Sequence, residues 1–315
     1  MYRKTRKKIN SRDAIIVSEL GFYSLKDTLE CGQAFSFTKI DSSEGDEYVI
    51  PIGSLLVRVA QYELGELVFY GISDEDFDAV IVPYFSLNTN YAAISEDIKK
   101  AYELPWFKDA VDNARGIAIL KQDAWETLFS FIVSQNNNIP RIRKILRRLC
   151  LEYGENLAEK NGITLCPISR HRATPCKENC GDCGICYSFP RAEDILAEPE
   201  RLLTANPGFR YRYLLDAAES VCSGRINLQA IENMGSYEKS LEELKKVVGV
   251  GDKVASCTAL FGLGNLDAFP IDVWMKRAID TYFDGSLDPK IFGKYAGVAQ
   301  QYIFHYIRNI ENKQT

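Results

Sequence analysis

The fold is decided by a short stretch in the second half of the chain, Leu244-Lys-Lys-Val-Val-Gly-Val-Gly-Asp-Lys-Val-Ala255. It joins two helical patterns through a tight turn whose glycines, Gly249 and Gly251, permit positive φ and leave backbone amides uncovered where the second helix begins. Such amides, at the positive end of a helix dipole, hold phosphate without any net protein charge. The stretch therefore predicts a helix-hairpin-helix with a phosphate site, and a plain tight turn is the alternative.

Two ionisable residues stand at helix starts near this hairpin. Lys253 opens the second helix, where the dipole disfavours a cation and so favours the neutral amine, which is a nucleophile. Asp272 follows Pro270 at the start of another helix, where a carboxylate caps free amides and stays ionised. Considered separately, the first also fits a solvated surface lysine and the second a simple N-cap. Only the combination of the two indicates a reactive site.

Apolar residues recur at helical spacing on both sides of the hairpin, from about residue 90 onward. Asp123 and Glu126 form a capping box, Asn138 caps the next helix and Gly154 ends it. Further helices are predicted over Ala192–Thr204, Arg210–Cys222, Tyr237–Val247, Val254–Phe261, Val273–Tyr282 and Ile291–Asn309.

The N-terminal part, from about residue 13 to 90, has short runs of β-branched and aromatic residues that predict strands. These runs are Ala34–Phe37, Tyr48–Ile52, Leu55–Val59 and Leu67–Tyr70. The predicted fold class is therefore α+β. We expect a basic tail over residues 1–12, an N-terminal antiparallel β-sheet domain over 13–115, and a helical helix-hairpin-helix domain over 116–311 with a cysteine-rich insertion at about 160–190.

The whole chain of 315 residues has a formal charge of −5, which argues against a polyanionic partner only if the distribution is ignored. Positive charge is grouped in the N-terminal tail and in one helix that contains Arg141, Arg143, Lys144, Arg147 and Arg148. These groups fit solvated faces as well as local contacts with nucleic acid. Nucleic acid therefore stays open as a partner.

The composition also indicates the cellular compartment in which the protein works. No apolar run approaches the ~20 residues that a membrane helix needs, and the basic start of the chain lacks the apolar core of a signal peptide. Nine cysteines is an odd number, and five of them crowd between Cys166 and Cys186, which suits free or metal-bound thiols better than a secreted disulfide framework. We expect an intracellular protein with no membrane partner, in the cytoplasm or nucleoid of a prokaryote or the nucleus of a eukaryote.

Five motifs, in order along the chain, resemble those of the 8-oxoguanine DNA glycosylase family of the helix-hairpin-helix superfamily. They are Thr28–Phe35 with its Gly-Gln-x-Phe, Leu120–Arg141 with its Asn-Asn-Asn-Ile-x-Arg, Gly208–Tyr213, Val247–Arg277 with the hairpin and the aspartate, and Ala299–Phe304. A lysine in the hairpin helix resembles the bifunctional members, which release the base and then nick the strand. The resemblance implies a DNA N-glycosylase and AP lyase of base excision repair.

The resemblance also assigns roles to residues of this chain. Lys253 is implied to be the nucleophile that forms a Schiff base, and Asp272 the carboxylate that stabilises positive charge developing on the sugar. The flipped base is implied to meet the carbonyl of Gly32, the sandwich of Cys257 and Phe304, and Gln300 on its Watson-Crick edge. Outside the resemblance, Gly32 fits a strand bulge, and Cys257 and Phe304 fit core residues.

The same resemblance implies the contacts with the rest of the duplex. Asn136 fills the vacated gap, Phe209 wedges between neighbouring bases, and Arg141 and Arg210 donate to the orphaned cytosine, while Gly249 and Gly251 hold phosphate. The implied partner is double-stranded DNA with 8-oxoguanine opposite cytosine, bound by a monomer. Two positions depart from the family: Trp274 stands where a histidine is usual, which puts a phosphate contact in doubt, and Phe209 replaces a commoner tyrosine.

A cysteine cluster lies where the resemblance lapses. Cys176, Cys180, Cys183 and Cys186 are spaced so that four thiolates can converge on one ion, which predicts a structural zinc site. An iron-sulfur cluster and unligated thiols are the alternatives. The implied chemistry needs no cofactor. Two other functions stay open at this point: a glycosylase for another oxidised base, and a non-catalytic DNA-binding protein that uses only the hairpin and the metal.

Overall fold

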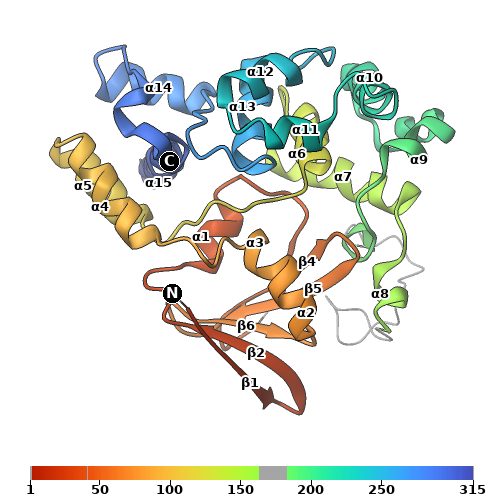
Figure 1. Cartoon of the computed structure of the whole chain (residues 1–315), viewed down its shortest axis with the longest axis horizontal. Coiled ribbons are helices and arrows are strands. Elements are labelled where there is room, and N and C mark those ends of the chain that lie inside the picture. The colour runs from red at the N-terminus through yellow and green to blue at the C-terminus, as the bar shows by residue number, and fades with distance from the viewer. Residues whose placement is uncertain (1, 41, 163–182, 315) are drawn as a thin grey trace.

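The computed structural model describes residues 2–40, 42–162 and 183–314. Figure 1 shows a sheet at one end of the molecule, beneath an assembly of helices that holds the C-terminal half of the chain. One hydrophobic core lies between the sheet and the helices α1, η1 and α3, and a larger one lies among the other helices. The predicted α+β class, with strands first and helices after, is confirmed.

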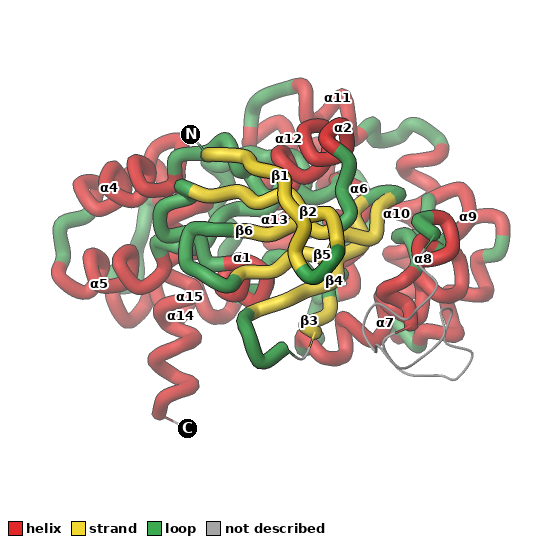
Figure 2. Tube along the Cα trace, turned by 90° about the horizontal axis from the view of Figure 1, so that it is seen from below, coloured by secondary structure: helices red, strands yellow, loops and turns green. Residues whose placement is uncertain are grey.

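The sheet has six antiparallel strands in the order β1-β2-β6-β5-β4-β3. Seen from below, it covers one side of the helical layer (Figure 2). One of its faces packs on α1, η1 and α3, and Val49 and Leu56 on the opposite face pack against α8 and η2. The strands are β1 (Arg3–Ile9), β2 (Arg12–Ser18), β3 (Thr38–Ile40), β4 (Asp46–Ile52), β5 (Leu55–Gln61) and β6 (Leu67–Tyr70).

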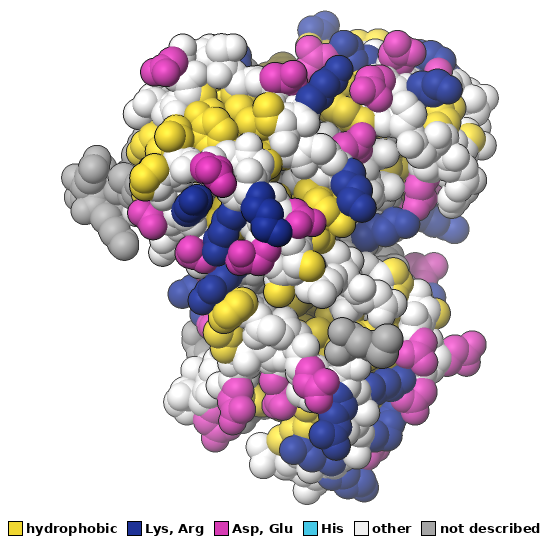
Figure 3. All heavy atoms as spheres, turned by 60° about the vertical axis from the view of Figure 1, so that its left-hand side comes forward, with side chains coloured by type: hydrophobic (Ala, Val, Ile, Leu, Met, Phe, Trp, Pro, Cys, Tyr) yellow, Lys and Arg dark blue, Asp and Glu magenta, His cyan; other side chains and the backbone are white. Residues whose placement is uncertain are grey.

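The expected basic tail over residues 1–12 is wrong, because Arg3–Ile9 is an edge strand. It pairs along its whole length with β2, and Lys4 and Arg6 form ion pairs with Asp74. The buried run from Ala14 to Val17 supplies the strand on which these charged residues pair. Lysine and arginine on an edge strand discourage pairing with other chains. Figure 3 shows basic side chains gathered at the sheet end of the molecule.

The predicted strand Ala34–Phe37 is also wrong, because this segment is a loop held by side chains. Gln33 is fully buried and its amide donates to the carbonyls of Thr28 and Ala118, both at 2.8 Å. The side-chain oxygen of Gln33, Oε1, accepts from the backbone amide of Leu120 at 2.8 Å. These bonds replace a strand ladder, so the motif is fixed without being part of the sheet.

Most helices follow the predicted periodicity with shifts of a few residues at their ends, but two predictions of single helices are wrong. Ala192–Thr204 is divided at Glu198 into α9 and the 3-10 helix η3, and Ile291–Asn309 is interrupted by non-helical backbone at Gly293. They are α1 (Leu25–Glu30), α2 (Asp74–Asp76), η1 (Phe77–Ile81), α3 (Val82–Tyr84), α4 (Tyr91–Ala101), α5 (Pro105–Ala114), α6 (Ala124–Val133), α7 (Ile139–Tyr153), α8 (Leu157–Lys160), η2 (Cys183–Cys186), α9 (Ala192–Ala197), η3 (Pro199–Ala205), η4 (Gly208–Arg210), α10 (Tyr211–Cys222), α11 (Leu228–Asn233), α12 (Tyr237–Leu244), α13 (Asp252–Phe261), α14 (Val273–Tyr282), η5 (Pro289–Tyr295) and α15 (Ala296–Gln314). Within the described residues, no helix is both long and apolar enough to cross a membrane.

Packing does not change at residue 115, where we placed the boundary between the two domains. Helices α4 and α5 precede that residue, yet Ile98 and Phe107 belong to the core of the helical part, together with Tyr302 and Ile303 of α15. Figure 1 shows α4 and α5 beside α15. The helical part of the fold therefore begins earlier in the chain, at about α4.

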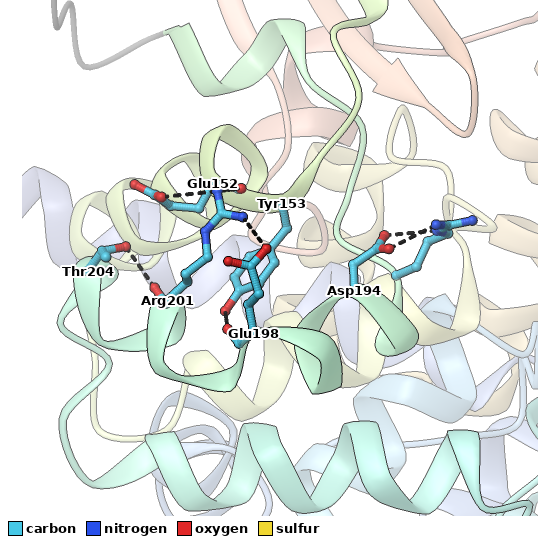
Figure 4. A network of polar contacts seen from close by, with 7 residues as sticks. Glu152, Tyr153, Asp194, Glu198, Arg201 and Thr204 are labelled. Carbon is cyan, nitrogen blue, oxygen red and sulfur yellow. Dashed lines mark hydrogen bonds and ion pairs between the residues drawn. The ribbon is translucent and has the colours of Figure 1, made fainter.

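Helix α7 ties the two parts together. Arg147 donates to the side-chain oxygen of Thr38 at 2.7 Å and to the carbonyl of Phe37, and Arg143 lies over the Phe37 ring at 4.0 Å. At its C-terminal end, Glu152 and Tyr153 join a network with Glu198 and Arg201 of the next described segment (Figure 4). Much of the positive charge of this helix therefore serves the fold.

Candidate active site and nucleic-acid interface

The hairpin between α12 and α13 is shaped by its first glycine. Gly249 has φ +86°, and a Cβ there would lie 2.4 Å from a ring carbon of Tyr213. The carbonyl of Gly249 accepts from the side-chain amide of Gln135 at 2.7 Å, and the amide of Val248 donates to Asp216 at 2.7 Å. Gly251 is the N-cap of α13 and its Cα faces open space, so the amides of the first turn can meet a phosphate.

Lys253 sits in the first turn of α13 and points across to α6. Its Nζ lies 3.1 Å from the hydroxyl of Ser134 and 4.7 Å from the centre of the Phe131 ring. The Ser134 hydroxyl donates its own hydrogen to the carbonyl of Phe131 at 2.7 Å. Its oxygen therefore accepts an N–H from Lys253, which fixes the position of the amine.

Cys257 and Asp272 lie close to this amine. Cys257 is one turn after Lys253 on the same helix, and its side chain is buried. Burial raises the pKa of the Cys257 thiol to about 11, while the charge of Lys253 opposes that shift and the charge of Asp272 adds to it. The Asp272 carboxylate caps α14 by accepting the amide of Met275 at 2.9 Å. The three predicted residues therefore surround one point.

The Gly-Gln-x-Phe motif approaches this point from the other side. Phe35 meets Phe131 edge to face at 5.5 Å, and Phe131 is the ring that lies beneath the amine of Lys253. Gly32, three residues before Phe35, has φ +94°, a conformation that a residue with a side chain rarely adopts. The backbone of Gly32 is thus held in place by the buried Gln33 that follows it.

Helix α15 lies beside the Gly-Gln-x-Phe motif. A Cβ at Gly32 would lie 3.8 Å from the Phe304 ring and 4.0 Å from Ile139, so the predicted partners Gly32 and Phe304 are neighbours. Gln300 is one turn before Phe304, is 3% exposed, and accepts from the side-chain amide of Gln301 at 2.7 Å. Its own amide group faces the same side of the helix as Phe304.

The residues predicted for the gap and the opposite base come together beside the hairpin. Asn136 is exposed and has φ +46°, and its carbonyl accepts from Arg210 at 2.9 Å. Arg210 also donates to the carbonyls of Gln135 and Pro207, and its side chain packs against the ring of Phe209 at 4.4 Å. Burial, and then the charge of Arg141, lower the pKa of Arg210, which places Arg141 nearby.

Arg210 uses more of its hydrogen-bond donors within the protein than its predicted contact with the opposite base implies. Its guanidinium is 3% exposed and most of its N–H donors are bonded to backbone carbonyls of the described residues. One N–H of Nη1 is left for a nucleotide base. Arg141 and Phe209 differ, because Arg141 is exposed and the Phe209 side chain is 51% exposed. Arg210 therefore braces the turn that presents Asn136.

Sequence reasoning missed the residues that support these groups. Ser134 holds Lys253, Gln33 holds Gly32, and Tyr213 packs on the hairpin. Each of these three residues lies in a motif that also contains a predicted site residue. Proximity in sequence to such a residue is therefore the signal that could have identified them. Support of this kind depends on contacts across the fold that no local pattern encodes.

The predicted zinc cluster lies mostly outside the described residues. Cys176 and Cys180 fall within 163–182, and only the backbone of Cys183 is described. Cys186 is buried at the end of η2, in a small core with Ile185 and Leu157. In the part of the chain that the structure describes, no group of histidine, cysteine and acidic side chains is arranged to hold a metal ion.

Comparison with known proteins gives consistent matches. A family model described as 8-oxoguanine DNA glycosylase, N-terminal domain, matches residues 15–128. The N-glycosylase/DNA lyase of Saccharomyces cerevisiae is 28% identical over 288 residues, which are 84% of this chain and 68% of that protein. The 8-oxoguanine glycosylase/lyase of Clostridium acetobutylicum in its apo form is 31% identical, with a TM-score of 0.79, over 96% of this chain and 98% of that one.

A second structure of the Clostridium acetobutylicum enzyme contains double-stranded DNA with cytosine opposite 8-oxoG. It is 30% identical to this chain, with a TM-score of 0.80 and 98% of both chains covered. A hairpin with a lysine and a neighbouring aspartate, set against an N-terminal sheet, defines a helix-hairpin-helix DNA glycosylase. Within that class, the chain belongs to the 8-oxoguanine DNA glycosylase family.

Proposed function

We propose that this protein is a bifunctional DNA glycosylase and AP lyase, which flips 8-oxoguanine out of double-stranded DNA, excises it and nicks the strand. The observation that carries the proposal is that Lys253, Cys257 and Asp272 lie close together, and that Gly32 and Phe304, both implied to meet the base, are neighbours. Family membership and the relatives' activities support the same reaction. The protein then acts in base excision repair.

The reaction begins with the amine of Lys253, which Ser134 holds through one N–H. The neutral amine attacks C1′ of the flipped nucleotide, the bond from C1′ to N9 breaks, and the base leaves with the bonding pair and takes up a proton. The Asp272 carboxylate stabilises the positive charge that develops on the sugar. The sugar ring opens to a Schiff base, loss of a C2′ proton breaks the C3′–O bond, and water then releases the lysine.

The lesion is distinguished by one atom. Oxidation converts guanine N7 from an acceptor to an N–H donor, which the carbonyl of Gly32 can accept. The positive φ of Gly32 sets the direction of that carbonyl. Phe304 and Cys257 enclose the base, and Gln300 faces its Watson-Crick edge. Normal guanine would set two acceptors against each other at this point.

The remaining duplex contacts follow from the cluster beside the hairpin. Asn136 enters the gap, Phe209 wedges between neighbouring bases, and Arg141, with the one free N–H of Arg210, donates to the opposite cytosine. Gly249 and Gly251 present amides to a phosphate of the backbone. We further propose that the protein works as a monomer inside the cell, and that Cys176, Cys180, Cys183 and Cys186 hold a structural zinc ion, which metal analysis and a visible spectrum would distinguish from an iron-sulfur cluster.

One assay tests the proposed function. Duplexes with 8-oxoguanine opposite each normal base, and a duplex with an oxidised pyrimidine, are incubated with the protein without and with borohydride. Without borohydride we expect excision of 8-oxoguanine, fastest opposite cytosine, and with borohydride we expect a trapped covalent adduct. Lys253→Gln should abolish the adduct, and Asp272→Asn should slow base release by about 10²-fold while lesion binding persists.

The controls separate the rival functions. Cleavage of the oxidised pyrimidine alone would point to a glycosylase for another base, and binding without cleavage would point to a non-catalytic protein. A fully active Lys253→Gln protein would overturn the assignment of the nucleophile. Thermal unfolding of each variant shows that lost activity does not come from lost folding.

A further inference from the structure

Arg308 is a cation beside Gly32 and Phe304 that the proposed mechanism does not use. It lies on α15 one turn after Phe304 and two turns after Gln300, so the three side chains share one face of that helix. Its guanidinium carbon is 5.3 Å from the centre of the Phe304 ring. A cation at this distance is attracted to the ring, which anchors the side chain at the pocket.

The guanidinium also reaches the backbone that recognises the lesion. Its Nη1 lies 3.6 Å from the position that a Cβ on Gly32 would take. Burial raises the pKa of the neighbouring Cys31 thiol to about 11, and among the opposing influences is the charge of Arg308. The distance to Gly32 therefore places this positive charge beside the Gly32 segment, and its influence on the pKa of Cys31 is consistent with that position.

The N–H donors of Arg308 have no acceptor among the residues that the structure describes. Within the described residues, the guanidinium makes no hydrogen bond and no ion pair, although it is only partly exposed. Other arginines of the helical part are engaged: Arg147 bonds Thr38, Arg201 bonds Glu152 and Arg225 pairs with Asp216. Donors that are unused and held near a pocket wall are suited to a ligand.

The edge of the oxidised base has the complementary pattern. Its N7–H is a donor that lies between two carbonyl oxygens, at C6 and C8, which are acceptors. Gly32 offers an acceptor, and Arg308 offers a charged donor next to it. We propose that Arg308 determines specificity by donating to a carbonyl oxygen on the N7 edge of the flipped oxidised purine. This inference rests on the proposed function.

The test compares two substrates that differ only in the base. Arg308→Gln should lower kcat/KM for 8-oxoguanine excision by about 10–100-fold, the usual effect of losing a charge-assisted hydrogen bond. Nicking of a duplex that already has an abasic site should be unchanged, because no base is present. Arg308→Lys keeps the charge and a donor, so its loss should be smaller.

A matched control is available in Arg115, whose guanidinium also lies over a phenylalanine ring, Phe22, at 3.5 Å. Arg115→Gln should affect neither substrate. An equal loss on both substrates for Arg308→Gln would mean a phosphate or structural contact and would overturn the inference, as would no loss on either. A wild-type protein that nicks abasic DNA but excises no 8-oxoguanine would instead overturn the proposed substrate, and the inference with it.

Discussion

Glu126 is the residue whose ionisation should most affect the fold. Burial raises the pKa of its carboxyl group to about 7, the hydrogen bond from Ser36 opposes that shift, and the charge of Asp123 adds to it. Glu126 lies in the first turn of α6, the helix whose other end contains Ser134. The ionisation of Glu126 should therefore affect the stability of α6, the helix that positions the amine of Lys253.

We predict that Glu126→Gln stabilises the protein at alkaline pH. The folded pKa lies above the unfolded value of about 4.3, so the wild type loses stability progressively as pH rises from about 4.3 to about 7, and above 7 it bears the full cost of the ionised carboxylate. Glutamine avoids this cost. At pH 8 the variant should be more stable by about 1–2 kcal/mol, less than the full shift implies because the side chain is partly exposed.

Urea unfolding at pH 5.5 and pH 8 checks this prediction, since the difference from wild type should shrink at the lower pH. Glu63→Gln is the control, because Glu63 is exposed and the same substitution there removes no buried carboxylate. A difference for Glu126→Gln that does not change with pH would contradict the prediction.

For individual residues, the sequence predicts the reactive groups better than it predicts the residues that hold those groups in place. Lys253 and Asp272 were predictable because each has an unusual position at a helix start, and both lie near Cys257. Ser134 and Arg308 were not, because serine and arginine are ordinary residues on a helix until contacts with another element are known. The predicted role of Arg210 was incomplete for the same reason.

Among the elements, the hairpin is the most sensitive to small changes. We predict that Gly249→Ala lowers the free energy of unfolding by about 2 kcal/mol or more, because it combines a positive φ with a Cβ 2.4 Å from the Tyr213 ring. Gly251→Ala is the matched control. Its φ of −99° suits alanine and its Cβ would meet open space, so the change should stay below about 1 kcal/mol.

Chemical denaturation of the two variants gives the measurement. The same proteins, titrated with abasic duplex, should show weaker DNA binding for Gly249→Ala, because the amides of the hairpin lose their arrangement. Equal stability of the two variants would show that Tyr213 moves aside easily and that the hairpin is not rigid.

Helices were easier to predict than strands. The helical periodicity and caps of α6, α7 and α13 are encoded within each segment, and Asp123 and Asn138 cap as expected. The strand β1 was missed because its seven residues are mostly charged, and only the partner β2 makes them a strand. Ala34–Phe37 was mistaken for a strand because its backbone partners come from Gln33 and from residues far along the chain.

For the whole molecule, the positive charge of α7 joins two parts of the fold. We predict that Arg147→Met lowers the free energy of unfolding by about 1–3 kcal/mol, because it leaves the oxygens of Thr38 and Phe37 without their donor. The dependence of DNA affinity on salt should stay as in wild type, since this guanidinium faces the sheet and releases no counterion.

Lys144→Met is the matched control on the same helix. Lys144 is exposed, so the change in stability should stay within about 0.5 kcal/mol. Urea unfolding and DNA titrations at several salt concentrations measure both effects. A shallower salt dependence for Arg147→Met would show that this residue contacts DNA. The sequence alone does not show that Arg147 stabilises the fold whereas Lys144 is exposed, because α7 has basic residues on more than one face.

The contact between Tyr213 and Gly249 has a mechanical consequence. Phe209 meets Tyr213 edge to face at 6.0 Å, and Tyr213 packs on the hairpin, so the proposed wedge and the proposed phosphate site have a common rigid support. In the proposed complex, the force that Phe209 exerts on stacked bases would be opposed by the contact between the hairpin and the backbone of the same duplex.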